Sequence, residues 1–147
     1  GYYLREENIM VERNLLGQET SRKNTVKSKT ILAVFPCRRE TLMSTLMHEL
    51  THDYLAENFP AWSEAPLWVQ EGLCQYAAAL YCQRQKLTEQ ATMIANNPDG
   101  IYGNGYRYFA DAFGDQGNWV SARRWLEQHQ PQQMPAGAPE VSPAAAP

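Results

Sequence analysis

Two histidines and a glutamate near the middle of the sequence have the types and spacing of a metal site. His48 and His52 stand four positions apart in "HELTH", and Glu49 directly follows the first of them. Residues four apart lie one above the other on a helix, so both imidazoles can reach one ion. Zinc accepts neutral imidazole nitrogen at about 2.0–2.1 Å, and a carboxylate beside the ion can take a proton from water. The pattern predicts His48 and His52 as zinc ligands and Glu49 as the general base.

A catalytic zinc ion needs a third protein ligand and an open position for water. The downstream residues with suitable donor atoms are Asp53, Glu57, Glu64, Glu71 and His129. Glu71 lies in "WVQEGLCQY" on the next expected helix and faces away from that helix's apolar ridge. The other four rotate away from the histidines, lie in a loop, or adjoin the C-terminal segment. Glu71 is therefore the predicted third ligand, and the adjacent Gly72 hints at close packing there.

A long helix over residues 38–58 is expected to position the two histidines, and it ends before Pro60. At about 100° per residue, one side of this helix is polar and includes the histidines. That polar stripe consists of Thr41, Thr45, His48, Glu49 and His52. The opposite side is apolar and consists of Met43, Leu46, Met47, Leu50 and Tyr54. Histidine and threonine are poorer helix formers than the Lys, Glu and Gln of a solvated face. The stripe therefore fits the wall of a partly enclosed polar site.

The remaining elements predict an α+β fold in which N-terminal strands precede helices. The strands are expected at residues 2–14 and 29–36, with a polar loop at 17–24 between them. Further helices are expected at residues 66–85, 87–95, 102–113 and 118–129. We expect one domain over residues 1–130 and a disordered Pro- and Ala-rich tail over 131–147.

The charge and composition exclude several classes of function. With 13 basic and 16 acidic residues the net charge is −3, which argues against a nucleic-acid-binding surface. The basic run between Arg22 and Lys29 is expected to be a solvated loop or strand face. No apolar run approaches the roughly 18 residues that cross a membrane.

The three cysteines are widely spaced and form no disulfide framework, which favours a reducing, intracellular compartment. Cys74 and Cys82 are expected as small buried side chains.

The combination of "HELTH" with the Glu71 of "EG" resembles the gluzincin metallopeptidases. In that family two histidines and a glutamate on the next helix hold the zinc. The segment "YGNGY", Tyr102 to Tyr106, resembles the family's Tyr-x-x-Gly-aromatic segment. The resemblance implies that Tyr102 stabilises the oxyanion of the tetrahedral intermediate, and that a strand edge, here "KTILAVFP", pairs with extended substrate. Packing is the favoured role for Tyr106, and a surface position is favoured for Arg107.

A narrower resemblance covers roughly residues 30–128. The segments "ILAVFPCRRETLMSTLMHELTHDYL", "VQEGLCQYAAALY" and "YGNGYR" are similar to the peptidase domain of plant LIM-domain peptidases, which ubiquitin activates and which limit organ growth. The resemblance implies a protein substrate and ubiquitin or another regulatory protein as partner. This chain has no LIM array of cysteines and histidines.

The leading hypothesis is a zinc-dependent peptidase, with an endopeptidase favoured because no acidic cluster for a free amino terminus is evident near the site. A catalytically inactive, zinc-stabilised protein-binding module is the alternative. A structural zinc usually has a fourth protein ligand, often Cys. Cys37 precedes the zinc helix and is the residue that would block or occupy the open position in this alternative. A small-molecule hydrolase with the same zinc chemistry is a third hypothesis.

Overall fold

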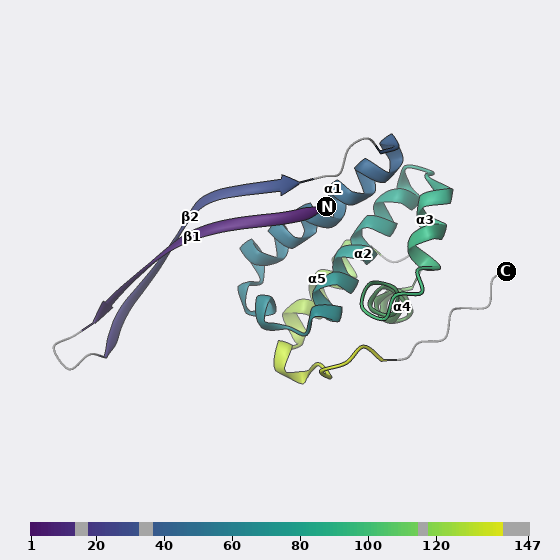
Figure 1. Ribbon diagram of the computed structural model, residues 1–147. Helices are drawn as coiled ribbons and strands as arrows, with labels where there is room; N and C mark the ends of the chain where they lie inside the picture. The colour runs from purple at the N-terminus through teal and green to yellow at the C-terminus, as the bar shows by residue number, and fades with distance from the viewer. Residues whose placement is uncertain (14–17, 33–36, 115–117, 140–147) are drawn as a thin grey trace.

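A long β-hairpin precedes five α-helices, which confirms the predicted α+β order of strands followed by helices (Figure 1). The computed structural model describes residues 1–13, 18–32, 37–114 and 118–139. Within these ranges the sheet has two strands, β1 (Tyr2–Arg13) and β2 (Glu19–Leu32), paired antiparallel. The first strand lies where the sequence predicted it.

The second strand begins earlier than predicted, so the expected loop at residues 17–24 is wrong from Glu19 onward. This part of β2 pairs with β1 although its side chains are polar, and Val11 lies opposite Arg22. A strand that faces water on both sides needs no apolar alternation, so the sequence pattern gave no signal for it. Lys29–Leu32 of the expected second strand end β2, and residues 33–36 lie outside the described residues.

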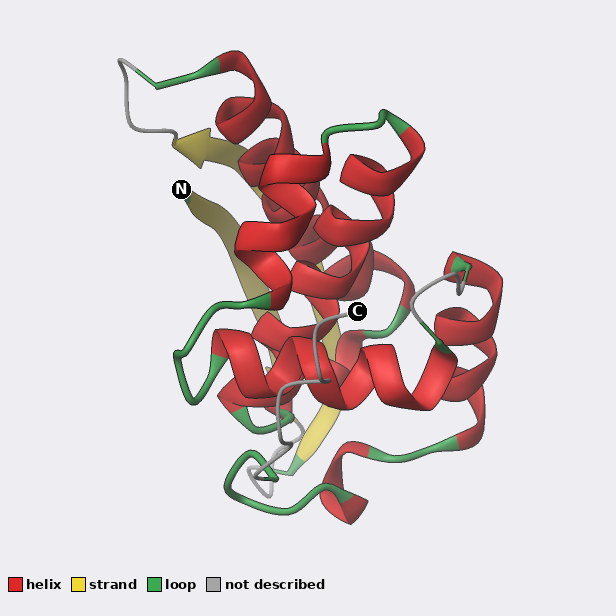
Figure 2. Cartoon of the chain, turned by 90° about the vertical axis from the view of Figure 1, so that its right-hand side faces the viewer, coloured by secondary structure: helices red, strands yellow, loops and turns green. Residues whose placement is uncertain are grey.

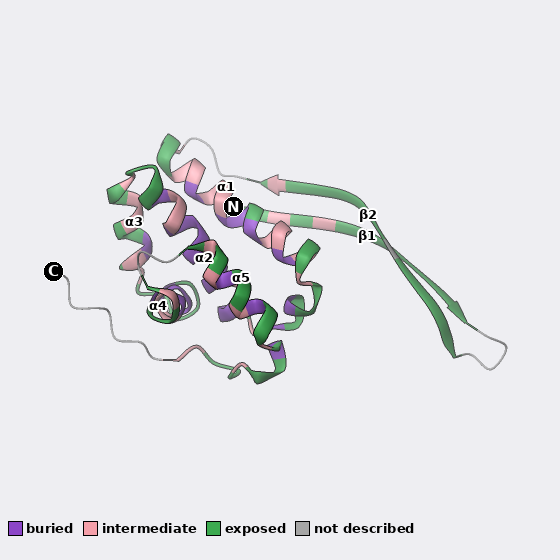
Figure 3. Ribbon diagram, turned by 180° about the vertical axis from the view of Figure 1, so that it is seen from behind, coloured by how far each residue is buried: buried purple, intermediate pink, exposed green. Residues whose placement is uncertain are grey.

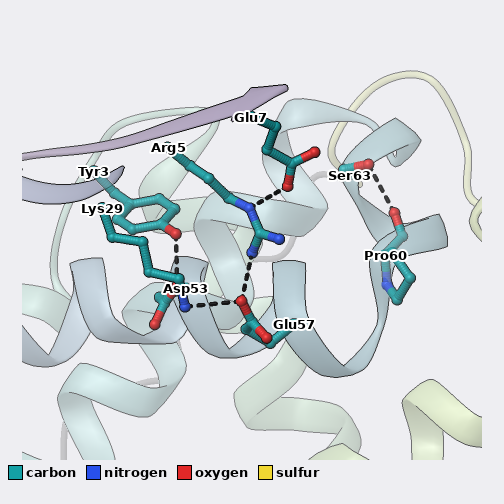
Figure 4. A network of polar contacts seen from close by, with 8 residues as sticks. All are labelled: Tyr3, Arg5, Glu7, Lys29, Asp53, Glu57, Pro60 and Ser63. Carbon is teal, nitrogen blue, oxygen red and sulfur yellow. Dashed lines mark hydrogen bonds and ion pairs between the residues drawn. The ribbon is translucent and has the colours of Figure 1, made fainter. Parts of the chain in front are cut away.

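Ion pairs attach the base of the hairpin to α1 (Arg39–Asn58), as Figure 4 shows. The Tyr3 hydroxyl donates to Asp53 Oδ1 at 2.6 Å, and Lys29 Nζ lies 2.8 Å from both Asp53 Oδ1 and Glu57 Oε1. Arg5 Nη1 donates to Glu57 Oε1 at 3.0 Å. Beyond this anchor the hairpin projects away from the helices, and most of it is exposed (Figures 1 and 3).

All five predicted helices are present in the described residues, with ends within two residues of the expected positions. Figure 2 shows that helices make up most of the molecule beside the hairpin. After α1 the chain forms a short 3₁₀ helix, Pro60–Glu64. The other helices are α2 (Leu67–Arg84), α3 (Thr88–Ala95), α4 (Tyr102–Phe113) and α5 (Trp119–Gln128). In the ranges that the structure describes, no helix has the length and apolarity to cross a bilayer.

The hydrophobic core surrounds α2, which packs between the other helices (Figure 3). Val69 and Leu73 of α2 are fully buried, as are Phe109 of α4 and Ala122 of α5. Aromatic rings link the last two helices, since Phe109 and Trp125 meet edge to face with centroids 5.4 Å apart. The core thus holds α2, and with it Glu71, at the centre of the helical part.

The segment after α5 contacts the helices through its first residues. Pro131–Gln133 form a 3₁₀ helix in which Pro131 is buried, and Trp68 Nε1 donates to the Pro135 carbonyl at 2.9 Å. Residues 140–147 lie outside the described residues. The domain boundary at residue 130 and the disordered tail over 131–147 stay predictions.

Candidate metal centre

The three predicted ligand side chains converge on one point between α1 and α2. His48 Nε2 lies 3.0 Å from Glu71 Oε2, and His52 Nε2 lies 3.5 Å from the same oxygen. The two Nε2 atoms are 3.3 Å apart. Three ligands at about 2.0–2.1 Å from one tetrahedral ion are separated by about 3.3–3.4 Å. The triangle of donor atoms therefore has the size that a zinc ion needs.

The polar stripe of α1 faces the inside of the protein. His48 is 9% exposed and Glu49 is 4% exposed, whereas Leu50 on the other side is 48% exposed. The side that looked apolar in the sequence is thus partly solvated, and the polar side is enclosed. Buried polar side chains are costly unless they have partners. The enclosure fits a site that binds a polar group or an ion.

Glu71 keeps a negative charge in this enclosed position. Burial raises the pKa of its carboxyl, but hydrogen bonds with His48 and His52 outweigh burial and lower the pKa to about 2. A carboxylate that is ionised at neutral pH between two imidazoles is suited to hold a cation. His48 Nδ1 is buried and has no hydrogen-bond partner among the described residues. The Nε2 side of this ring, which faces the triangle, is therefore the side with polar contacts.

Tyr102 stands at the start of α4 and faces His48. The ring centroids of Tyr102 and His48 are 6.2 Å apart, and Tyr102 is 37% exposed. Burial raises the pKa of its hydroxyl, and the nearby carboxylates of Glu71 and Asp99 raise it further. The phenol is therefore protonated at neutral pH and can donate a hydrogen bond into the site.

The turn before α4 fixes the position of Tyr102. Asp99 Oδ1 accepts hydrogen bonds from the backbone N–H groups of Ile101 at 2.7 Å and Tyr102 at 2.8 Å. Arg107 Nη1 donates to the Asn97 carbonyl at 2.9 Å, so Arg107 holds this turn in addition to lying partly at the surface. These contacts give the residues around "YGNGYR" a local structural role.

Two glycines allow α2 and α4 to touch through their backbones. A Cβ atom on Gly72 would lie 2.6 Å from Cα of Gly105, and one on Gly105 would lie 2.4 Å from the Trp68 carbonyl oxygen. Any larger residue would push the helices apart. The crowding that Gly72 suggested in the sequence therefore exists, and it brings the start of α4 towards Glu71.

Cys74 is buried, as the sequence predicted, but its position beside the two histidines was not predicted. Its sulfur and the ligand nitrogens of His48 and His52 all lie within 4.8 Å of one another. The thiol is fully buried, and burial, together with the carboxylates of Glu71 and Glu49, raises its pKa well above the usual value. The spacing Glu71-x-x-Cys74 puts both side chains on one side of α2, which is the signal that could have found it.

The other candidate ligands lie elsewhere. Asp53 and Glu57 bind the hairpin through Lys29, and His129 Nδ1 lies 2.9 Å from the Trp125 carbonyl oxygen. In the part of the chain that the structure describes, Cys37 does not belong to the cluster of ligand atoms around His48. Of the five candidate third ligands, all within the described residues, only Glu71 contacts the histidines.

Two cavities flank the triangle. The smaller one, of about 230 Å³, reaches Tyr2 and Tyr3 of β1, and the larger one, of about 360 Å³, extends towards α3. His48, Glu49 and Tyr102 line both. The candidate base and the tyrosine therefore stand between two spaces that an extended chain can enter.

No protein-family model, no curated protein and no solved structure matches the chain. The likeness to gluzincin peptidases therefore rests on the motif residues themselves.

Proposed function

We propose that this chain is a zinc-dependent peptidase, with His48, His52 and Glu71 as the ligands. The observation that carries the proposal is the triangle of ligand atoms, with sides of 3.0, 3.3 and 3.5 Å. When bound, zinc would supply a Lewis acid that lowers the pKa of water and polarises a carbonyl group.

The protein's own residues then perform the proton transfers. Glu49 lines the cavities beside the ligands, and in this position it accepts a proton from the attacking water and delivers it to the leaving amine. Tyr102 donates a hydrogen bond to the carbonyl oxygen as negative charge develops there. Neither residue is needed to hold an ion, so their presence beside the triangle favours catalysis over a structural site.

Cavities on both sides of Glu49 favour an endopeptidase. An extended substrate can continue past the reacting bond in both directions, towards β1 on one side and towards α3 on the other. The strand nearest the site is the start of β1, since Tyr2 and Tyr3 line the smaller cavity. We therefore propose β1, in place of "KTILAVFP", as the strand beside the substrate.

The decisive experiment compares Glu49→Gln with Glu57→Gln. Both substitutions remove one carboxylate from α1, but Glu57 binds the hairpin. We expect both variants to retain one equivalent of zinc, and only Glu49→Gln to lose peptide hydrolysis, by about 10²-fold or more. Equal turnover of Glu49→Gln and wild type, or wild type that binds no zinc, would contradict the proposal.

The position of Cys74 favours a second candidate, a zinc-stabilised binding module without catalysis. A small shift would bring its sulfur into the fourth position and close the site, as in structural zinc centres. Zinc X-ray absorption spectroscopy separates the two functions. The peptidase predicts only nitrogen and oxygen ligands and unchanged zinc affinity in Cys74→Ala. A sulfur ligand at about 2.3 Å would favour the closed, structural site.

A further inference from the structure

The larger cavity beside Glu49 is lined by uncharged polar side chains from two helices and the turn before α4. Gln75 comes from α2, Gln90 from α3, and Asn97 from the turn before α4. Besides Glu49 and His48, the ionisable groups in the lining are the Tyr102 phenol and the Gly1 ammonium, whose nitrogen lies 3.9 Å from Glu49 Oε1. A volume of about 360 Å³ is enough for one substrate side chain and part of its backbone.

The hydrogen bonds within the protein leave amide N–H groups free to face this cavity. Asn97 Oδ1 accepts from the backbone N–H of Asp99 at 2.9 Å, which fixes the oxygen and leaves the Asn97 amino group available. Gln90 Oε1 accepts from the Thr41 hydroxyl at 3.3 Å, and within the described residues its amino group has no partner either. Both amino groups can therefore donate a hydrogen bond to a ligand in the cavity.

Gln75 is half-buried and lines the same cavity. Within the described ranges its carboxamide makes no hydrogen bond to the protein. It lies one turn after Glu71 on the same side of α2, so it is next to the candidate metal ligands. A carboxamide in this position can both donate and accept.

We propose that this cavity is a subsite for a substrate residue with a neutral carboxamide side chain, glutamine or asparagine. This inference rests on the proposed peptidase function and specifies its substrate. A carboxamide supplies the oxygen that the N–H groups of Gln90 and Asn97 need, and its own N–H can be accepted by Gln75. A carboxylate side chain would be repelled by Glu49, which already lies 3.9 Å from the Gly1 ammonium, and a leucine would give the amides no polar partner in the cavity.

The test measures cleavage and binding separately. Peptides that differ only in the residues next to the cleaved bond carry Gln, Asn, Leu, Lys or Glu there. Turnover is measured with the zinc-loaded wild type, and Kd with the Glu49→Gln variant, which serves as a common non-cleaving background. We expect kcat/KM and affinity to favour Gln or Asn over Leu by about tenfold.

Two substitutions in the cavity should move this preference. Gln75→Leu should reduce the tenfold preference to less than about twofold, and Gln75→Glu should shift it towards Lys. Gln83→Glu is the matched control, because it makes the same charge change on an exposed part of α2 and should leave the preference unchanged.

The outcomes separate the two proposals. A carboxamide preference in binding, lost in Gln75→Leu, with no hydrolysis by the wild type, would support the subsite and contradict the peptidase. Hydrolysis with no preference, or with a preference that Gln75→Leu and Gln75→Glu leave unchanged, would support the peptidase and overturn the subsite.

Discussion

The helix α1 holds two carboxylate clusters whose residues are similar in sequence but whose surroundings differ. Glu49 of the inner cluster is buried near the Gly1 ammonium, and the neighbouring Glu71 of α2 contacts both imidazoles. Asp53 and Glu57 lie further along α1 and pair with the hairpin cations. The inner cluster is enclosed and arranged around a point where an ion fits. The outer cluster pairs each carboxylate with a cation already present in the protein (Figure 4).

The partners of the carboxylates distinguish a candidate site from a structural contact. The outer charges are neutralised within the molecule and reach solvent, so they need no ligand. In the inner cluster Glu71 contacts two imidazoles, which are neutral when they bind a metal, so in the proposed zinc site the ion supplies the positive charge. We expect substitution of His48, His52 or Glu71 to change zinc binding, and substitutions in the outer cluster to change only stability.

The largest effect is expected from loss of a histidine ligand. Zinc at about a thousand times its Kd should stabilise the wild type by about 4 kcal/mol, and a chelator should remove this increment. His52→Ala should lose the zinc-dependent rise in Tm. The adjacent Asp53→Asn is the control and should keep it. An equal zinc-dependent rise in Tm for His52→Ala and Asp53→Asn would contradict the distinction between the inner and outer clusters.

A smaller effect is expected from the helix crossing beside the inner cluster. Gly105→Ala should lower the free energy of unfolding by about 1–3 kcal/mol, because its Cβ would overlap the Trp68 carbonyl. The added methyl group should also displace α2, which carries Glu71, and so weaken zinc binding. Gly100→Ala is the control, as no atom lies within 4 Å of its added Cβ. Denaturant unfolding and zinc titration of both variants provide the check.

The sequence was sufficient for the features that depend on local spacing. His48 and His52 share one side of a helix whatever surrounds them, and Glu71 could be chosen because it opposes the apolar ridge of its own helix. Cys74 was missed because its small, apolar character fits a core residue equally well, and only the packing of α2 on α1 brings it near the histidines. The start of β2 at Glu19 was missed because an exposed strand has no buried face to impose alternation.

A modest effect is expected from the outer cluster. Lys29→Met keeps most of the side-chain stem but removes both ion pairs, and should lower the free energy of unfolding only slightly, because exposed ion pairs contribute little. The loss should shrink as salt concentration rises, because exposed charges are screened. Zinc stoichiometry should stay at the wild-type value. A Lys29→Met protein that no longer bound zinc would show that the two clusters are coupled.

The smallest effect is a pH dependence of that same substitution. Hydrogen bonding with Lys29 lowers the pKa of Glu57 from its ordinary value of 4.5. A folded-state pKa below the unfolded value gives stability that is present above pH 4.5 and is lost as the pH falls through the folded-state pKa. The difference in Tm between wild type and Lys29→Met should therefore be constant near neutral pH and narrow below pH 4.5. Thermal unfolding across this range is the measurement, and a gap that widened in acid would contradict it.

The contact between Gly72 and Gly105 fixes the distance between α2 and α4 through main-chain atoms alone. Main chains in direct contact cannot adjust by changing side-chain rotamers. They therefore set the closest approach of α4 to α2. The gap between Glu71 and Tyr102 then does not depend on which side chains line the neighbouring cavity. In the proposed peptidase, residues such as Gln75 could then be replaced to change the accepted substrate while Glu71 and Tyr102 keep their spacing.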